Sequence, residues 1–249
     1  MAGHSKWSQI KRKKGALDVK RGQLFSKLGK EIQVAAKLGG GDPELNPRLR
    51  TAITAAKAES MPNDNIDRAI LKGTGQLEGG NNYEEMVYEG YGPDGIAILA
   101  EVMTDNKNRS AAEIRSIFNK GNGSLGAPGS VAWMFEHKGF FYIKNGDEEQ
   151  LFELTVEAGA DDIKSDEADS VEIYCPLDCF DKVDKALSGA GVTPETTKLA
   201  YFPKDETELA GDAALSVMKL IDTLDDHDDV QNVYTNLSIS DQLLDQLNQ

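Results

Sequence analysis

The chain has 249 residues, with 27 Lys and Arg against 42 Asp and Glu, so its formal net charge at pH 7 is −15. A composition of 39% hydrophobic and 28% charged residues is that of a folded globular protein and argues against a disordered chain. No apolar run approaches the roughly 18–20 residues that cross a bilayer, and the polar start argues against a signal peptide, so we expect a cytoplasmic protein without a membrane segment.

Basic residues are concentrated at the N-terminal end. Residues 1–75 hold 15 Lys and Arg but only 7 Asp and Glu, a local net charge of +8, which leaves −23 for the rest of the chain. Exposed charges are screened over about 8 Å at physiological ionic strength, so a positive end can persist beside a negative body. This separation of charge predicts a polyanionic partner that meets the N-terminal end.

Three helices are expected within residues 1–75. Apolar residues recur every three or four positions in each, and their stripes can close around one small core. The first helix should end at the glycine run 39–41, and the third at Gly73. Their expected starts are Leu17, the cap and first-turn proline Asn46–Pro47, and Pro62–Asn63.

The basic cluster at the start of the chain is the strongest chemical signal. Lys and Arg neutralise phosphates and release counterions, while Trp7 offers a flat face to an unstacked base. Residues before about Gly15 lack an apolar stripe, so we expect a mobile arm there. The alternatives are a solvated basic face, or a Trp7 that caps the helical core. The candidate nucleic-acid-binding residues are Lys6, Trp7, Lys11, Arg12, Lys13, Lys14, Lys20, Arg21, Lys27, Lys30, Arg48 and Arg50.

After a polar, glycine-rich linker at residues 74–82, the pattern changes to strands and helices. Residues 92–95 join the first two strands in a hairpin. The predicted elements are strands 86–91 and 96–102, helix 110–120, strands 131–135 and 140–143, helix 148–158, strand 171–175, helix 177–187, a strand near 199–202, helix 206–224 and strand 230–234.

Residues 137–204 alternate strand and helix like a complete split βαβ unit. The unit before it has strands but one covering helix, so the C-terminal helix and strand are expected to return and complete it. The predicted fold class is therefore α+β, with an N-terminal three-helix domain followed by two α/β ferredoxin-like (split βαβ) domains, the last inserted in the middle one. The predicted domains are a basic nucleic-acid-binding domain (1–75), a discontinuous α/β domain (83–136 plus 205–249) and an inserted acidic α/β domain (137–204).

One glycine-rich stretch, Gly121 to Gly126, matches the spacing of a dinucleotide-binding loop. That function needs a strand before the loop and a helix after it, whereas the predicted order here is helix and then strand. The stretch is therefore interpreted as an ordinary loop. Residues 105–109 form a polar segment that is predicted to cap the following helix.

Acidic and sulfur-containing residues do not predict a catalytic or metal site. Cys175 and Cys179 with three scattered histidines are too few for a tetrahedral metal centre, so reduced thiols are expected. Nucleophile signatures are absent, so we predict no enzyme activity, no catalytic residues, no metal and no cofactor. The acidic groups are interpreted as solvated surface; they are Glu84, Glu85, Glu89, Asp225, Asp226, Asp228 and Asp229, the last four flanking His227.

Several stretches of the sequence resemble the YebC family. They are residues 1–7 (MAGHSKW), 21–28 (RGQLFSKL), 39–43 with 46–50, 61–62 with 65–66, 88–93 (YEGYGP) and 228–234 (DDVQNVY). The resemblance covers essentially the whole chain and implies a three-domain, non-enzymatic cytoplasmic protein. Family members are usually labelled probable transcriptional regulators that bind DNA, mitochondrial relatives activate translation of a cytochrome oxidase subunit, and bacterial ones have been tied to the ribosome.

The expected function is therefore a cytoplasmic nucleic-acid-binding regulator of gene expression, by family label a DNA-binding transcriptional regulator. A translation factor that binds the ribosome through ribosomal RNA is the main alternative, since no helix displays groove-reading side chains. An enzyme acting on nucleic acid and a protein-only adaptor that uses the acidic domains are further alternatives. The expected partners are DNA or ribosomal RNA, with the ribosome or the transcription machinery meeting the acidic domains.

Overall fold

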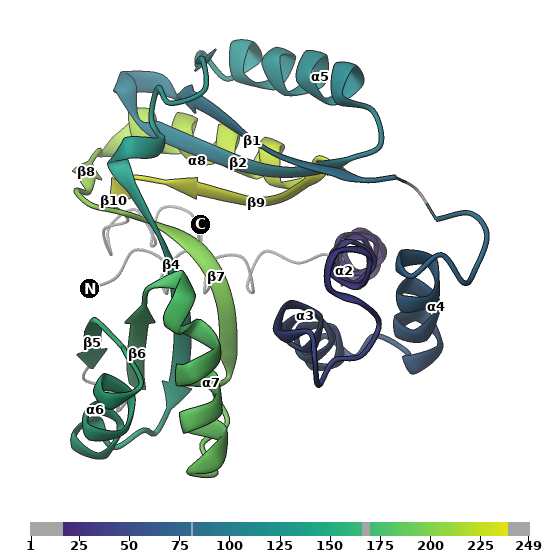
Figure 1. Cartoon of the computed structure of the whole chain (residues 1–249). Coiled ribbons are helices and arrows are strands. Elements are labelled where there is room, and N and C mark those ends of the chain that lie inside the picture. The colour runs from purple at the N-terminus through teal and green to yellow at the C-terminus, as the bar shows by residue number, and fades with distance from the viewer. Residues whose placement is uncertain (1–16, 81, 166–169, 239–249) are drawn as a thin grey trace. The chain divides into compact units, whose positions relative to one another are not determined.

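The computed structural model describes residues 17–80, 82–165 and 170–238, with side chains from residue 21 onward. The chain forms two compact units, one of residues 136–202 and the other of the segments that precede and follow them (Figure 1). The arm expected before Gly15 lies outside the described residues.

The three predicted helices are confirmed. They share one apolar core, built from Ile32, Ala35, Ala36, Leu49, Ala52, Ala56, Met61, Ile66 and Ala69. Asn46 begins the second helix as predicted, since its side-chain oxygen accepts the N–H of Leu49 at 3.1 Å. Its amide nitrogen also donates to the carbonyls of Ala35 and Gly40, both at 2.8 Å, which ties the first helix to the start of the second. The helices are α2 (Leu17–Gly39), α3 (Pro47–Ala58) and α4 (Asn63–Gly73).

Two glycines in these helices have opposite surroundings. A β-carbon on Gly73 would lie 2.3 Å from the carbonyl oxygen of Gln33, a backbone atom that cannot yield without moving α2. A β-carbon on Gly29, inside α2, would meet nothing within 4 Å. We therefore expect Gly29→Ala to raise the free energy of unfolding by about 0.5–1 kcal/mol. Gly73→Ala should lower it by about 1–3 kcal/mol. Chemical denaturation of both variants measures the difference, and a Gly73→Ala variant as stable as wild type would contradict the close approach.

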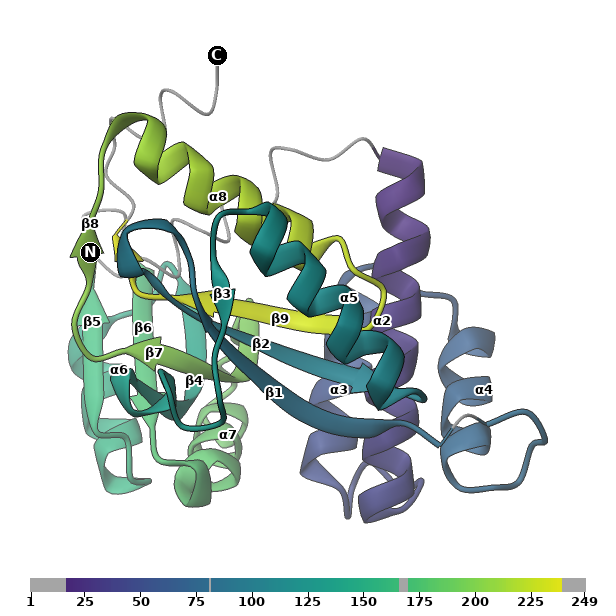
Figure 2. The ribbon, with the colours of Figure 1, turned by 90° about the horizontal axis from the view of Figure 1, so that it is seen from above.

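A four-stranded antiparallel sheet, the first sheet, forms the rest of this unit. Its strand order is β3-β1-β2-β9, so the C-terminal strand pairs with the second strand of the hairpin, as the predicted insertion requires. Helices α5 and α8 cover one face and enclose a core that includes Ile98, Phe118 and Leu220 (Figure 2). The elements are β1 (Glu84–Tyr91), the turn η1 (Pro93–Gly95), β2 (Ala97–Thr104), α5 (Lys107–Lys120), β3 (Ser124–Leu125), α8 (Gly211–Asp225) and β9 (Val230–Thr235).

Residues 136–202 form the second unit around a sheet of order β5-β6-β4-β7. This order and the sequence strand, helix, strand, strand, helix, strand are those of the predicted split βαβ fold. Its core contains Phe141, Ile173 and Val183. The elements are β4 (Phe135–Lys144), α6 (Glu148–Glu157), β5 (Asp162–Ser165), β6 (Ser170–Cys175), η3 (Leu177–Cys179), α7 (Phe180–Gly189) and β7 (Thr196–Pro203).

Two local predictions are wrong, and some short strands were missed. Residues 131–135 are not a strand: they contain the 3-10 turn η2 (Ala132–Met134), and the strand starts only at Phe135. The last helix starts at Gly211, because residues 207–208 form β8 (Thr207–Glu208), which pairs in parallel with β10 (Leu237–Ser238). Strands β3 and β5 were not predicted from the sequence. The glycine-rich stretch of residues 121–126 does follow a helix and lead into β3, as its interpretation as a loop requires.

Candidate nucleic-acid interface

The structure describes the side chains of five of the predicted nucleic-acid-binding residues: Arg21, Lys27, Lys30, Arg48 and Arg50. Six others, Lys6, Trp7, Lys11, Arg12, Lys13 and Lys14, lie outside the described residues. Lys20 belongs to α2, but its side chain is not described. The described five do not share one environment: one is exposed at the start of α2, and the other four contact protein groups.

Arg21 is exposed on the first turns of α2, and its guanidinium lies 5.4 Å from the centre of the Phe25 ring. Stacking on a ring leaves the donors at the edge of the guanidinium able to reach an outside acceptor. Arg50 is half-buried, and its Nη1 donates to the carbonyl of Pro43 at 3.2 Å. Arg21 therefore keeps hydrogen-bond donors exposed to solvent, whereas Arg50 supports the loop between α2 and α3.

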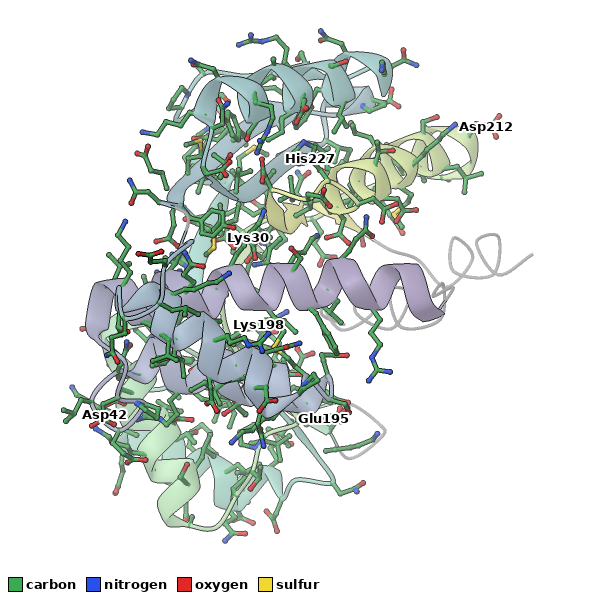
Figure 3. All side chains as sticks on the ribbon, turned by 90° about the vertical axis from the view of Figure 1, so that its right-hand side faces the viewer. Lys30, Asp42, Glu195, Lys198, Asp212 and His227 are labelled. Carbon is green, nitrogen blue, oxygen red and sulfur yellow. The ribbon has the colours of Figure 1, made fainter. Side chains whose placement is uncertain are left out.

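Lys27 and Lys30, one turn apart on α2, reach the C-terminal end of α8 and the residues that follow it. We call residues 225–229 the acidic turn. The ammonium of Lys30 lies 2.9 Å from Oδ1 of Asp229 and 2.8 Å from the carbonyl oxygen of Asp228. That of Lys27 lies 3.7 Å from Oδ1 of Asp225 and also donates to the carbonyl of that residue, at the end of α8. Cations are stabilised at a helix C-terminus, where backbone carbonyls lack partners. Figure 3 shows Lys30 on the side of α2 that faces the turn carrying His227.

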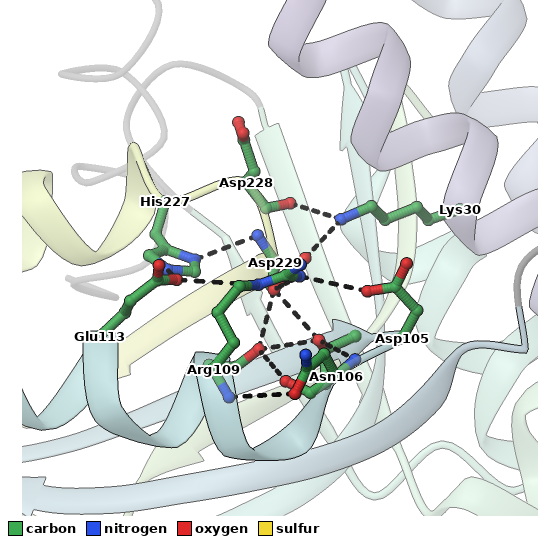
Figure 4. Close-up of polar contacts among 10 residues, drawn as sticks. Lys30, Asp105, Asn106, Arg109, Glu113, His227, Asp228 and Asp229 are labelled. Carbon is green, nitrogen blue, oxygen red and sulfur yellow. Dashed lines mark hydrogen bonds and ion pairs between the residues drawn. The ribbon is translucent and has the colours of Figure 1, made fainter.

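Asp229 is the centre of a polar network (Figure 4). Its side chain is 6% exposed, and Oδ2 accepts from Arg109 at 2.7 Å, from the Ser110 hydroxyl at 2.8 Å and from the Thr104 hydroxyl at 3.1 Å. Burial alone would raise the pKa of this carboxyl, but the hydrogen bonds from Arg109, Lys30 and Ser110 hold it well below its usual range. Asp229 is therefore an ionised carboxylate inside the protein, and the interpretation as solvated surface is wrong for this residue.

Arg48 joins the helices to the first sheet. Its guanidinium donates to both carboxylate oxygens of Glu31, on α2, at 2.8 and 3.1 Å, and to both oxygens of Glu85, on β1, at 2.5 and 3.0 Å. Burial alone would lower the pKa of Arg48, but these two carboxylates raise it above its ordinary value. Because the fork of Arg48 is filled by carboxylates, it serves here as a link between elements.

Glu89 is also not a surface acid. It is buried on β1, where Oε1 accepts the N–H of Gly129 at 2.6 Å and Oε2 accepts those of Val131 and Ala132, each at 2.8 Å. Burial would raise the pKa of Glu89, but these three backbone donors hold it below its usual value. The carboxylate fixes the loop that carries Trp133, a tryptophan that is 65% exposed.

Sequence reasoning missed Asp229 and Glu89 as structural carboxylates because their partners are distant in the chain. The prediction for residues 105–109 was better, since Asn106 caps α5 by accepting the N–H of Arg109 at 3.1 Å. Cys175 and Cys179 are free thiols. Burial raises the pKa of Cys175 to about 12. Within the described residues no group of His, Cys, Asp and Glu is arranged to hold a metal ion, and no helix is long and apolar enough to span a membrane.

The fold and the contacts together define a class of three-part α+β protein. A basic helical segment precedes an antiparallel sheet, and a split βαβ unit is inserted in the sequence between the strands of that sheet. Residues 5–76 match the family model of the TACO1/YebC protein N-terminal domain, and residues 83–237 match that of the TACO1/YebC second and third domain. The chain therefore belongs to the TACO1/YebC family.

Relatives with full-length similarity carry regulatory names. A protein of Desulfatibacillum aliphaticivorans is 55% identical over 243 residues, which cover 97% of this chain and 98% of the relative. One of Natranaerobius thermophilus is 54% identical over 250 residues, covering 98% and 99%. Both are named probable transcriptional regulatory protein. The crystal structure of a conserved hypothetical protein from Aquifex aeolicus superposes with a TM-score of 0.81 at 43% identity, over 91% of this chain and 94% of that one.

Proposed function

We propose that this protein is a non-enzymatic, cytoplasmic regulator of gene expression that binds nucleic acid through its basic N-terminal end, with DNA as the first candidate target. The charge separation carries the proposal: residues 1–75 have a net charge of +8, and the rest of the chain has −23. A polyanion is attracted to the first part and repelled by the second. The regulatory names of the relatives support the same role.

The described contacts indicate that the basic residues of the predicted site have different roles. Lys30 and Arg48 are bound to carboxylates, so phosphate contacts are assigned first to the residues that precede α2 and to Arg21. Contacts of this kind fix position and supply affinity without reading sequence. With Glu85 and Glu89 committed to Arg48 and to the loop of residues 129–132, neither supports the alternative of a metal-dependent nuclease.

The salt dependence of binding tests this proposal. With about six phosphate contacts, the slope of log affinity against log salt should be near −5 for duplex DNA. Replacing Lys11, Arg12, Lys13 and Lys14 by Ala should flatten it to about −2. The matched control replaces four lysines of the acidic part of the chain, Lys182, Lys185, Lys204 and Lys219, and should leave the slope unchanged. Fluorescence anisotropy at several salt concentrations gives the slope, and an equal slope for all three proteins contradicts the proposal.

The same binding assay separates DNA from ribosomal RNA. A transcriptional regulator should protect a preferred sequence in duplex footprinting, with mismatched base pairs costing about 1–3 kcal/mol each. A translation factor should instead sediment with ribosomes and prefer ribosomal RNA over duplex DNA at matched salt. Footprints without sequence preference together with ribosome co-sedimentation would move the assignment to the translation factor.

A further inference from the structure

The helices and the first sheet are joined by polar contacts. The apolar cluster of α2, α3 and α4 and the apolar cluster under α5 and α8 are separate, and neither includes a residue of the other. Between them lie the ion pairs of Lys27, Lys30 and Arg48 with Asp225, Asp229 and Glu85. Ion pairs exchange partners more readily than a packed core separates, because water and other ions can replace each partner.

The acidic turn supplies the two lysines of α2 with anionic oxygen ligands, as the phosphates of a nucleic acid would. Phosphate binds lysine through anionic oxygens at hydrogen-bond distance, and the turn supplies anionic oxygens and helix-end carbonyls to Lys27 and Lys30. The side chains of these two lysines are only 14% and 10% exposed. A phosphate can therefore reach them only after the turn has withdrawn.

The polar network around Asp229 also limits the free-energy cost of breaking its contact with Lys30. If Lys30 leaves, Asp229 keeps Arg109, Ser110 and Thr104 as donors, all on the first-sheet side of the contact. Removing every partner from a buried carboxylate costs several kcal/mol, but Asp229 is not left in that state. Lys30 in turn gains water or a phosphate, so the contact can open and close without unfolding either core.

We propose that the acidic turn is an internal competitor for Lys27 and Lys30, and that a nucleic acid must displace it to occupy this face of α2. The inference rests on the proposed function, because it concerns the regulation of the same basic surface. Residues that precede α2 would make first contact, and the two lysines would add phosphate contacts once the turn is released. The closed contact lowers affinity for any polyanion that cannot displace it.

Charge-neutralising variants on the acidic side test the competition without touching the lysines. Asp225→Asn and Asp229→Asn should each tighten nucleic-acid binding about fivefold or more, the scale of intramolecular coupling. The matched control is Asp228→Asn, which removes the same charge from the same turn, although Lys30 contacts this residue through its backbone carbonyl. The control should change affinity less than about twofold, as expected for an exposed charge. If Asp229→Asn fails to fold, the comparison of Asp225→Asn with Asp228→Asn decides the test.

Zero-length carbodiimide crosslinking gives an independent readout. In the free protein it should join Lys30 to Asp229 and Lys27 to Asp225, and saturating nucleic acid should suppress both crosslinks. Their absence in the free protein overturns the competition whatever the protein binds. Wild type that binds with unchanged crosslinks, or variants that match the control, overturn the competition and leave the proposed function standing. If neither wild type nor variant binds DNA or ribosomal RNA, the proposed function fails and the competition fails with it.

Discussion

Asp229→Ala is expected to lower the free energy of unfolding by about 2–4 kcal/mol. The substitution leaves Lys30, a side chain that is 10% exposed, without its carboxylate, and it removes an acceptor that the buried Ser110 and Thr104 hydroxyls share. Arg109 is 45% exposed and can turn to water, so the loss should stay below that of a fully buried ion pair. Urea denaturation followed by circular dichroism measures the change.

The acid limb of the stability curve provides a second measurement at Asp229. Its pKa in the folded protein lies below the unfolded value of about 3.9, so its contribution is present above about pH 4 and is lost as pH falls through the folded pKa. The difference in stability between wild type and Asp229→Ala should therefore be constant from about pH 5 upward and shrink below pH 4. Asp228→Ala is the neighbouring control and should change stability by less than about 0.5 kcal/mol. Equal losses for both variants would contradict the network.

Local signals in the sequence were sufficient for elements whose partners lie within a few residues. Asn46 was predicted as a cap, and residues 105–109 were predicted to cap the next helix, because a cap binds an N–H three residues later; Asn46 does so, and within residues 105–109 it is Asn106 that does. The helical core followed from apolar spacing alone, and the strand and helix order gave the split βαβ unit although β5 was missed. β5 is short and polar (DIKS), so it lacks the alternation that predicts a strand.

Contacts between distant residues explain what the sequence could not show. Residues 131–135 are apolar enough for a strand, but the N–H groups of Val131 and Ala132 are bound to Glu89, more than 40 residues earlier, and a 3-10 turn results. Lys30 and Asp229 are 199 residues apart. A cluster of lysines predicts affinity for anions, but it cannot tell whether those anions belong to a partner or to the same chain. Only the fold shows that part of the basic surface is already bound.

Glu89→Ala is expected to lower the free energy of unfolding by about 3 kcal/mol and to release the loop of residues 129–134. Three backbone N–H groups lose their acceptor, and each buried donor without a partner costs about 1–3 kcal/mol before water or rearrangement recovers part of it. Trp133 reports the loop directly once Trp7, the other tryptophan of the chain, is replaced by Phe. The emission of Trp133 should then change in Glu89→Ala under conditions where the protein remains folded.

Two further variants separate the effect of the hydrogen bonds between Glu89 and the loop from a general effect of removing a charge. Glu89→Gln keeps the shape and one acceptor oxygen but turns an amide donor toward backbone donors, so its loss should be intermediate, about 1–2 kcal/mol. Glu84→Gln removes a charge from the exposed start of the same strand and should change stability by less than about 0.5 kcal/mol. The pKa of folded Glu89 lies below the unfolded value of about 4.3. Wild type should therefore lose the stability that the ionised carboxylate contributes as pH falls through the folded pKa. If Glu89→Gln were as stable as wild type, with unchanged Trp133 emission, the carboxylate would not be what holds the loop.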